Sequence, residues 1–233
     1  MSPMLEKLQA LDARIVAAVE AAGRPRDAVQ FIAVSKTHPV ETLREAVAAG
    51  VHTFGENYLQ EALDKIAALG PGICWHFIGP IQSNKTRPVA EHFDWVQSVD
   101  RLKIAERLSA QRPPEKGPLN VCLQVNISGE ETKSGVTPAE LPALAQAVAR
   151  LPQLRLRGLM AIPAPTTDVA QQHADFARLR ALYEQLQRDG LALDTLSMGM
   201  SADMEAAIAE GATLIRIGTA LFGARDYSQK APA

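Results

Sequence analysis

The first segment of the chain carries apolar side chains at steps of three and four residues. Leu5, Leu8 and Leu11 begin this series, Val19 ends it, and Gly23 follows. This spacing places the apolar side chains on one face of a helix, and glycine is common just past a helix end. We therefore predict an amphipathic helix that ends at Gly23 and packs against a larger body.

From residue 31 onward, short runs rich in β-branched and aromatic residues alternate with longer helical patterns. Strands that alternate with helices run parallel and are joined by right-handed crossovers. Eight strands are predicted, at 31–35, 51–54, 74–78, 94–99, 120–126, 154–160, 195–198 and 214–217.

Capping signals mark the helices between these strands. Thr137 and Glu140 have the spacing of a capping box, and Asp168 can cap the helix that follows it. Gly50 and Gly211 close helical patterns just before a strand begins, as residues free to adopt positive φ. Each predicted unit is therefore a strand followed by a helix.

Eight such units in about 200 residues approach the lower size limit of a closed (β/α)₈ barrel. We predict an α/β fold with one domain over 1–233, in which the first helix is an addition to the barrel. An open doubly wound sheet is the alternative. Little chain follows the eighth strand, so no second β-domain is expected at the C-terminal end.

Composition excludes several classes of protein. The 24 basic and 26 acidic residues give a net charge of −2 without a basic cluster, so neither nucleic acid nor an anionic membrane is an expected partner. The first segment has no uninterrupted apolar run, which argues against a signal peptide or membrane span. Cys74 and Cys122 lack Cys or His neighbours at metal-ligand spacing, so no metal site is expected and a reducing, cytoplasmic location suits them.

Lys36 closes the first predicted strand and is the first candidate for chemistry. Barrel sites lie at the C-terminal ends of the strands. Partial desolvation there can lower the pKa of a lysine and free its neutral amine to attack a carbonyl. The alternative is a solvated lysine, or one paired with a carboxylate.

The second candidate comes from the turns after strands seven and eight. Ser201, Gly218 and Thr219 could bind phosphate, because hydroxyls and exposed backbone N–H groups donate to phosphate oxygens. Alternatively, Ser201 is only a helix cap and Gly218 only a turn glycine.

Closure of the barrel would place the eighth strand beside the first, so one ligand with an aldehyde and a phosphate could reach both candidates. Pyridoxal 5′-phosphate (PLP) is such a molecule, and its ring nitrogen needs a partner. Arg216 lies two residues before Gly218, on the same strand face, and is in register to reach that ring. An ion pair with an acidic neighbour is the alternative role for Arg216.

Five separated motifs resemble the YggS/PROSC family of pyridoxal phosphate homeostasis proteins. They are FIAVSKTHP around Lys36, FGENYLQEA at 54–62, WHFIGPIQSNKTRPV at 75–89, SMGMSADMEAAI, and RIGTALFG. The resemblance covers nearly the whole chain. It implies a fold-type III PLP barrel similar to the N-terminal domain of alanine racemase, with PLP held as a Schiff base on Lys36. It also implies phosphate contacts from Ser201, Gly218 and Thr219, Arg216 near the pyridine nitrogen, and Asn57 in the same mouth.

Catalysis on a PLP substrate requires a group that moves a proton at Cα. In the alanine racemase relatives that group is a tyrosine from a second β-domain, which is not expected here. Tyr183 belongs to an outer helix and Tyr227 to the tail, so only Tyr58 lies near the mouth. We therefore predict a monomeric PLP carrier without catalytic residues, which buffers PLP or hands it to PLP-dependent apo-enzymes.

Two enzymatic alternatives remain. One is a cryptic fold-type III enzyme such as an amino-acid racemase, with Tyr58 or His76 as its base. The other is a barrel aldolase that uses Lys36 on a phosphosugar.

Overall fold

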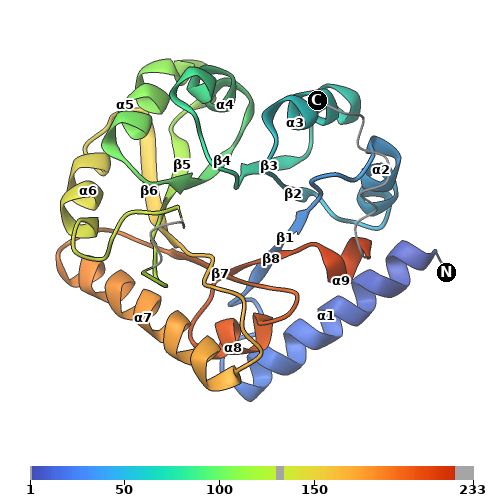
Figure 1. Cartoon of the computed structure of the whole chain (residues 1–233). Helices are drawn as coiled ribbons and strands as arrows, with labels where there is room; N and C mark the ends of the chain where they lie inside the picture. Colours follow the sequence, from blue (N-terminus) through green and yellow to red (C-terminus); the bar gives the residue numbers. More distant parts are fainter. Residues whose placement is uncertain (1, 130–133, 224–233) are drawn as a thin grey trace.

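A computed structural model of the chain describes residues 2–129 and 134–223. Within these ranges, eight parallel strands pair in chain order and β8 pairs with β1, which closes the barrel (Figure 1). The predicted (β/α)₈ barrel is confirmed, and the open sheet is wrong. The strands are β1 (Gln30–Val34), β2 (Thr53–Glu56), β3 (Cys74–Phe77), β4 (Trp95–Val99), β5 (Leu119–Gln124), β6 (Leu154–Met160), β7 (Thr195–Met200) and β8 (Leu214–Ile217).

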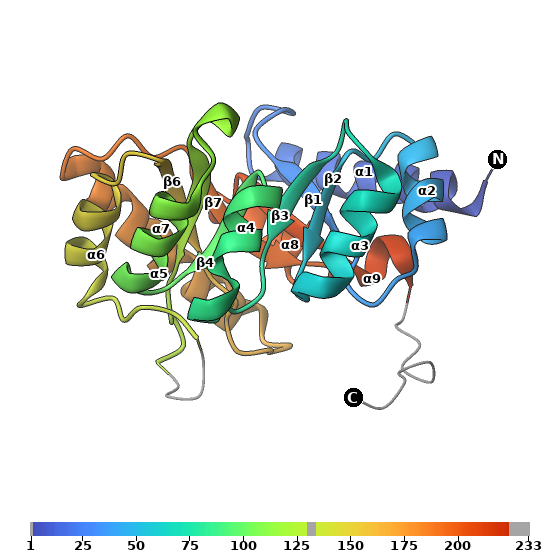
Figure 2. The same cartoon turned by 90° about the horizontal axis from the view of Figure 1, so that it is seen from above.

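Helices surround the strands in both cartoon views (Figures 1 and 2). In the described ranges, none of them combines the length and apolar character needed to cross a membrane. The α-helices are α1 (Pro3–Ala21), α2 (Val40–Ala48), α3 (Leu59–Leu69), α4 (Thr86–His92), α5 (Leu102–Gln111), α6 (Leu141–Val148), α7 (Val169–Arg188), α8 (Met204–Ala209) and α9 (Thr219–Phe222), and short 3₁₀ helices span Ser83–Lys85 and Pro114–Lys116.

Apolar side chains pack on both sides of the barrel wall. The large core joins the outer faces of the strands to the helices. A second cluster contains Ile32, Val34, Ile78 and Leu214. Val34 and Ile78 line a pocket at one end of the barrel and Leu214 lines a cavity at the other, so this cluster lies inside the barrel.

The predicted helix at the start of the chain is α1. Leu11 and Val19 on its apolar face are buried, and Arg14 forms an ion pair with Glu205 of α8 at 2.6 Å. The helix ends two residues before Gly23, which has φ 65°. The prediction that this helix packs against a larger body is therefore confirmed.

Strand β2 begins two residues later than predicted at 51–54. Val51 belongs instead to the end of α2, where its N–H donates to the Ala46 carbonyl at 2.9 Å and that of Gly50 donates to the Val47 carbonyl at 2.9 Å. These two bonds form a Schellman motif, in which an apolar residue follows the glycine. The apolar side chain that suggested a strand start is thus part of a helix cap.

Two predicted helix starts have different outcomes. Asp168 caps α7 and accepts from the Ala170 N–H at 2.9 Å, as predicted. Thr137 and Glu140 are hydrogen-bonded at 2.6 Å, but α6 begins only at Leu141. The capping-box pair therefore closes the turn that precedes the helix.

Candidate functional site

Lys36 continues the inward-facing series of strand β1. Side chains alternate along a strand, so Lys36 follows Ile32 and Val34 on the inner side of the barrel wall. Ser35, which lies between Val34 and Lys36, is fully buried on the outer side. Lys36 therefore enters the barrel at the carboxyl ends of the strands, where barrel enzymes build their sites.

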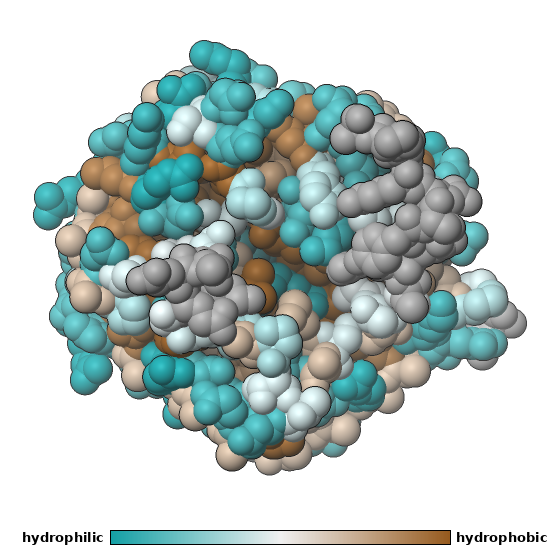
Figure 3. Space-filling view, in the orientation of Figure 1, coloured by the Kyte–Doolittle hydropathy of each residue, from teal (hydrophilic) through white to brown (hydrophobic). Residues whose placement is uncertain are grey.

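A pocket of about 370 Å³ opens at this end of the barrel. Figure 3 shows a hollow at the centre of this face, where apolar and polar surfaces meet. Ile162 and Met200 add apolar walls, a role that the sequence analysis missed because both lie where strands give way to loops. The structure brings all six predicted binding residues into the lining: Lys36, Asn57, Ser201, Arg216, Gly218 and Thr219.

Arg216 crosses from β8 toward the neighbouring strands. It donates to the Ser197 hydroxyl at 2.7 Å and to the Ala161 carbonyl at 2.8 Å. No carboxylate of the described residues lies within ion-pair distance of it, so the ion pair considered from sequence is not formed. Burial lowers the pKa of Arg216 to about 10, which leaves its guanidinium charged at neutral pH.

A buried hydrogen-bond chain continues from Arg216 through the barrel. Ser197 donates to the Gln97 amide oxygen at 2.6 Å, and the Gln97 amide nitrogen lies 2.9 Å from His76 Nδ1. Burial lowers the pKa of His76 to about 3, so its ring is neutral and Nδ1 accepts from Gln97. His76 is thus a buried, hydrogen-bonded histidine, whereas Gln97 and Ser197 were missed from sequence.

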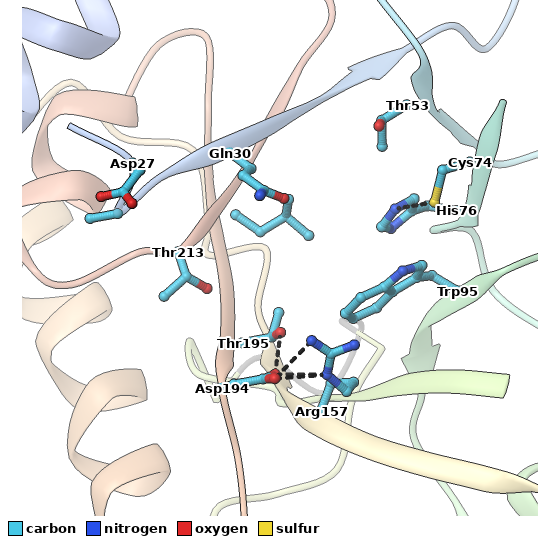
Figure 4. Close-up of a pocket in the computed structure, with 12 residues that line it drawn as sticks. Asp27, Gln30, Thr53, Cys74, His76, Trp95, Arg157, Asp194, Thr195 and Thr213 are labelled. Carbon is cyan, nitrogen blue, oxygen red and sulfur yellow. Dashed lines mark hydrogen bonds and ion pairs between the residues drawn. The ribbon is translucent and has the colours of Figure 1, made fainter. Parts of the chain in front are cut away.

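This series of hydrogen bonds ends at His76, which lines a second cavity of about 340 Å³ (Figure 4). The other residues that line this cavity lie near the starts of the strands. His76 stacks on Trp95 with ring centroids 5.1 Å apart, and Arg157 lies 4.6 Å from the centre of the Trp95 ring. Arg157 is also paired with Asp194 at 2.7 Å. In the described part of the chain, no three His, Cys, Asp or Glu side chains are grouped to hold a metal ion.

The two turns predicted to hold phosphate are bonded to each other. The Ser201 hydroxyl accepts from the Ala220 N–H of α9 at 3.2 Å, whereas the cap residue of α8 is Asp203. Gly218 has φ −114°, outside the left-handed region. The Ser201 hydroxyl thus caps the first turn of α9 rather than the helix that follows it, and Gly218 is the N-cap residue of α9, so both residues have a structural role in these turns.

The protein family described as alanine racemase, N-terminal domain, matches residues 7–226 of this chain. The fold and the site at its mouth accordingly place the chain in the class of barrels found at the N-terminus of that enzyme.

Known proteins define the family more closely. The pyridoxal phosphate homeostasis protein of Pseudomonas aeruginosa is 65% identical, with 100% of both chains covered. That of Escherichia coli K12 is 53% identical over 99% of this chain and 100% of its own. A solved structure of PipY from Synechococcus elongatus with PLP bound has a TM-score of 0.82 and 42% identity, and covers 94% of this chain and 100% of PipY. The chain belongs to the family of pyridoxal phosphate homeostasis proteins.

The chemistry of the pocket fits PLP, which carries an aldehyde, a phosphate and a ring nitrogen. Lys36 is an amine, the turn at Ser201 supplies a hydroxyl, and Arg216 is a charged donor. Asn57 Oδ1 is buried and has no hydrogen-bond partner among the described residues. Buried oxygens of this kind normally accept a hydrogen bond. Asn57 Oδ1 can therefore accept a hydrogen bond from a bound ligand.

Proposed function

We propose that this protein binds PLP in the pocket at the mouth of the barrel, buffers it and delivers it to PLP-dependent apo-enzymes without efficient catalysis. The observation that carries the proposal is the convergence of Lys36, Arg216 and the Ser201 turn on one pocket, although they come from opposite ends of the chain. The names of the relatives and the PLP-bound PipY structure support it.

Each group has a separate task in this proposal. PLP supplies an aldehyde, which condenses with the Lys36 amine to a Schiff base and releases one water molecule. Ser201 and Thr219 donate to the phosphate, together with the backbone at Gly218. Arg216 offers only N–H donors and stays charged, so it favours an unprotonated ring nitrogen. An unprotonated ring withdraws electrons weakly, which suits storage of PLP better than bond breaking.

The placement of possible bases also favours a carrier. Tyr58 is 48% exposed and does not line the pocket, and Tyr183 donates to the Leu193 carbonyl at 3.0 Å from the outer helix α7. Tyr227 lies outside the described residues. His76 belongs to the cavity at the opposite end of the barrel. Neither of the two bases considered for a racemase, Tyr58 and His76, lines the pocket that contains Lys36.

We further propose that the protein acts as a cytoplasmic monomer. Cys74 and Cys122 form no disulfide, and burial raises the pKa of each thiol to about 12, so both thiols stay protonated. Unpaired cysteines suit a reducing compartment. Among the residues that the structure describes, the exposed large apolar side chains are few and come from different elements, which favours a monomer.

The test is to load the protein with PLP, reduce it with borohydride and map the label by peptide mass spectrometry. We expect one label, at Lys36, that is lost in Lys36→Ala and kept in the exposed-lysine control Lys85→Ala. A label elsewhere, or none, would contradict the proposal. Amino-acid turnover at ordinary enzymatic rates would favour the cryptic racemase, and a colourless protein that traps a phosphosugar on Lys36 would favour the aldolase.

A further inference from the structure

A buried charged cluster lies directly behind Lys36, between the barrel wall and helix α3. The Lys65 ammonium is 2.7 Å from Glu56 Oε1 and 2.5 Å from Glu61 Oε1. Side-chain exposure is 3% for Lys65, 0% for Glu56 and 31% for Glu61. Ser35 also donates to Glu56, at 2.5 Å. Three ionisable side chains thus share a site that is largely closed to solvent.

This cluster binds both peptide groups that flank Lys36. Lys65 Nζ donates to the Ser35 carbonyl at 2.8 Å, on the N-terminal side. Glu61 Oε1 accepts from the Thr37 N–H at 2.6 Å, on the C-terminal side. The backbone of Lys36 is therefore held at both ends by one ion pair, although the pair reaches it from outside the barrel.

The alternation of the strands explains how the cluster reaches the backbone and leaves the side chain in the pocket. Ser35 and Glu56 are the outward-facing neighbours of the inward-facing Lys36 and Asn57. Glu61 and Lys65 are four residues apart on α3, so they lie on the same face of that helix. The cluster occupies the outer side of the wall, and the Lys36 side chain projects from the inner side.

The local backbone shows that this arrangement is constrained. Among the described residues other than glycine, only Thr37 has a positive φ, of 68°. Such a conformation is disfavoured for a β-branched residue and persists only where its surroundings enforce it. The bond from the Thr37 N–H to Glu61 is a constraint of that kind. The turn after Lys36 thus depends on Glu61.

Stability alone is a weak reason for this cluster, because buried ion pairs can often be replaced by apolar side chains without loss. We propose that Lys65 and Glu61 are positioning residues, which fix the backbone of Lys36 so that its amine meets the aldehyde of PLP. This inference rests on the proposed function, since it assumes that Lys36 is the residue that binds PLP covalently.

The test compares covalent and non-covalent binding in Lys65→Met and Glu61→Ala. Absorbance after mixing with PLP measures Schiff-base formation, and a fluorescence titration with pyridoxine 5′-phosphate, which lacks the aldehyde, measures the pocket itself. We expect Schiff-base formation to slow roughly ten- to a hundredfold, the scale of a small misplacement of a reacting group. Affinity for pyridoxine 5′-phosphate should change less than about twofold, because the phosphate turns are intact.

Two further variants separate positioning from folding. Glu61→Gln keeps an oxygen that can accept from the Thr37 N–H, so it should restore most of the rate. Arg112→Met removes another buried cation bound to backbone carbonyls, at Ala90 and Phe93, far from Lys36 in sequence. It should lower the melting temperature and leave Schiff-base formation unchanged. If Lys65→Met does not fold, Glu61→Ala carries the test because Glu61 is only partly buried.

The outcomes are distinct. A wild-type protein that forms no Schiff base on Lys36 would overturn the proposed function and this inference with it. Wild-type rates in both Lys65→Met and Glu61→Ala would overturn the inference alone. A parallel loss of PLP and pyridoxine 5′-phosphate binding would also overturn it, because the cluster would then support the whole pocket rather than the lysine.

Discussion

The buried neutral state of His76 predicts a specific loss of stability in acid. Its pKa falls from 6.5 to about 3 because burial disfavours the charged ring. In the unfolded chain the ring is solvated and binds a proton below pH 6.5. The unfolded state therefore binds more protons than the folded state between pH 6.5 and about 3, and stability falls as the pH is lowered through that range.

The size of the effect follows from the two pKa values. Each unit of difference between the two pKa values corresponds to about 1.4 kcal/mol. Lowering the pH through the full interval would therefore reduce the free energy of unfolding by roughly 5 kcal/mol. Between pH 7 and pH 5, where the folded ring is still neutral, the contribution of His76 is about 2 kcal/mol of unfolding free energy.

The comparison is between the wild type and His76→Asn, whose amide oxygen can replace Nδ1 as the acceptor for Gln97. Urea unfolding, followed by tryptophan fluorescence and circular dichroism at pH 7, 6 and 5, gives the free energy of unfolding of each protein. The other titrating groups are common to both, so the difference in pH dependence isolates His76. Parallel curves, within about 0.5 kcal/mol of one another, would refute the argument by showing that no proton uptake is linked to this ring.

Four other substitutions test the site and the barrel. Ser197→Ala removes a buried acceptor from Arg216, so we expect the free energy of unfolding in urea to fall by about 1.5 to 3 kcal/mol. PLP binding, measured by titration, should also weaken. Unchanged values would show that the hydrogen bond from Arg216 to Ser197 does not hold Arg216 in place. Ser201→Ala and Thr219→Val should each weaken PLP binding by about 1 to 3 kcal/mol, and a double variant with wild-type affinity would place the phosphate elsewhere. In Gly158→Ala the new Cβ would lie 1.6 Å from a carbonyl oxygen of β7, so we expect a loss above about 3 kcal/mol; a wild-type melting temperature would contradict this.

The fold was predictable because local patterns carry most of it. Alternating strands and helices determine parallel pairing, and eight repeats favour closure. The error at Val51 arose because an apolar residue after a helix-ending glycine resembles the start of a strand. That ambiguity is settled only by the bond from Val51 to the preceding helix.

The site was predictable where a reactive or ligand-binding residue directly follows a predicted strand. Lys36 and the turn at Ser201 are conspicuous because reactive or glycine-rich segments follow apolar runs. Gln97 and Ser197 were not predictable in the same way. They are hydrogen-bonded across a separation of 100 residues, and a polar residue inside a strand gives no indication of its partner. Lys65 was missed because a lysine on a helix is normally solvated.

The pairing of β8 with β1 has a consequence for biosynthesis. While the polypeptide emerges from the ribosome, Lys36 is made 165 residues before Ser201 and 180 residues before Arg216, so the amine is present long before β8 can pair with β1. On the proposed function, a chain that has not yet reached β8 would offer the Lys36 amine without the turns proposed to bind phosphate. On the proposed function, stable retention of PLP would thus begin only once β8 has been made and has paired with β1.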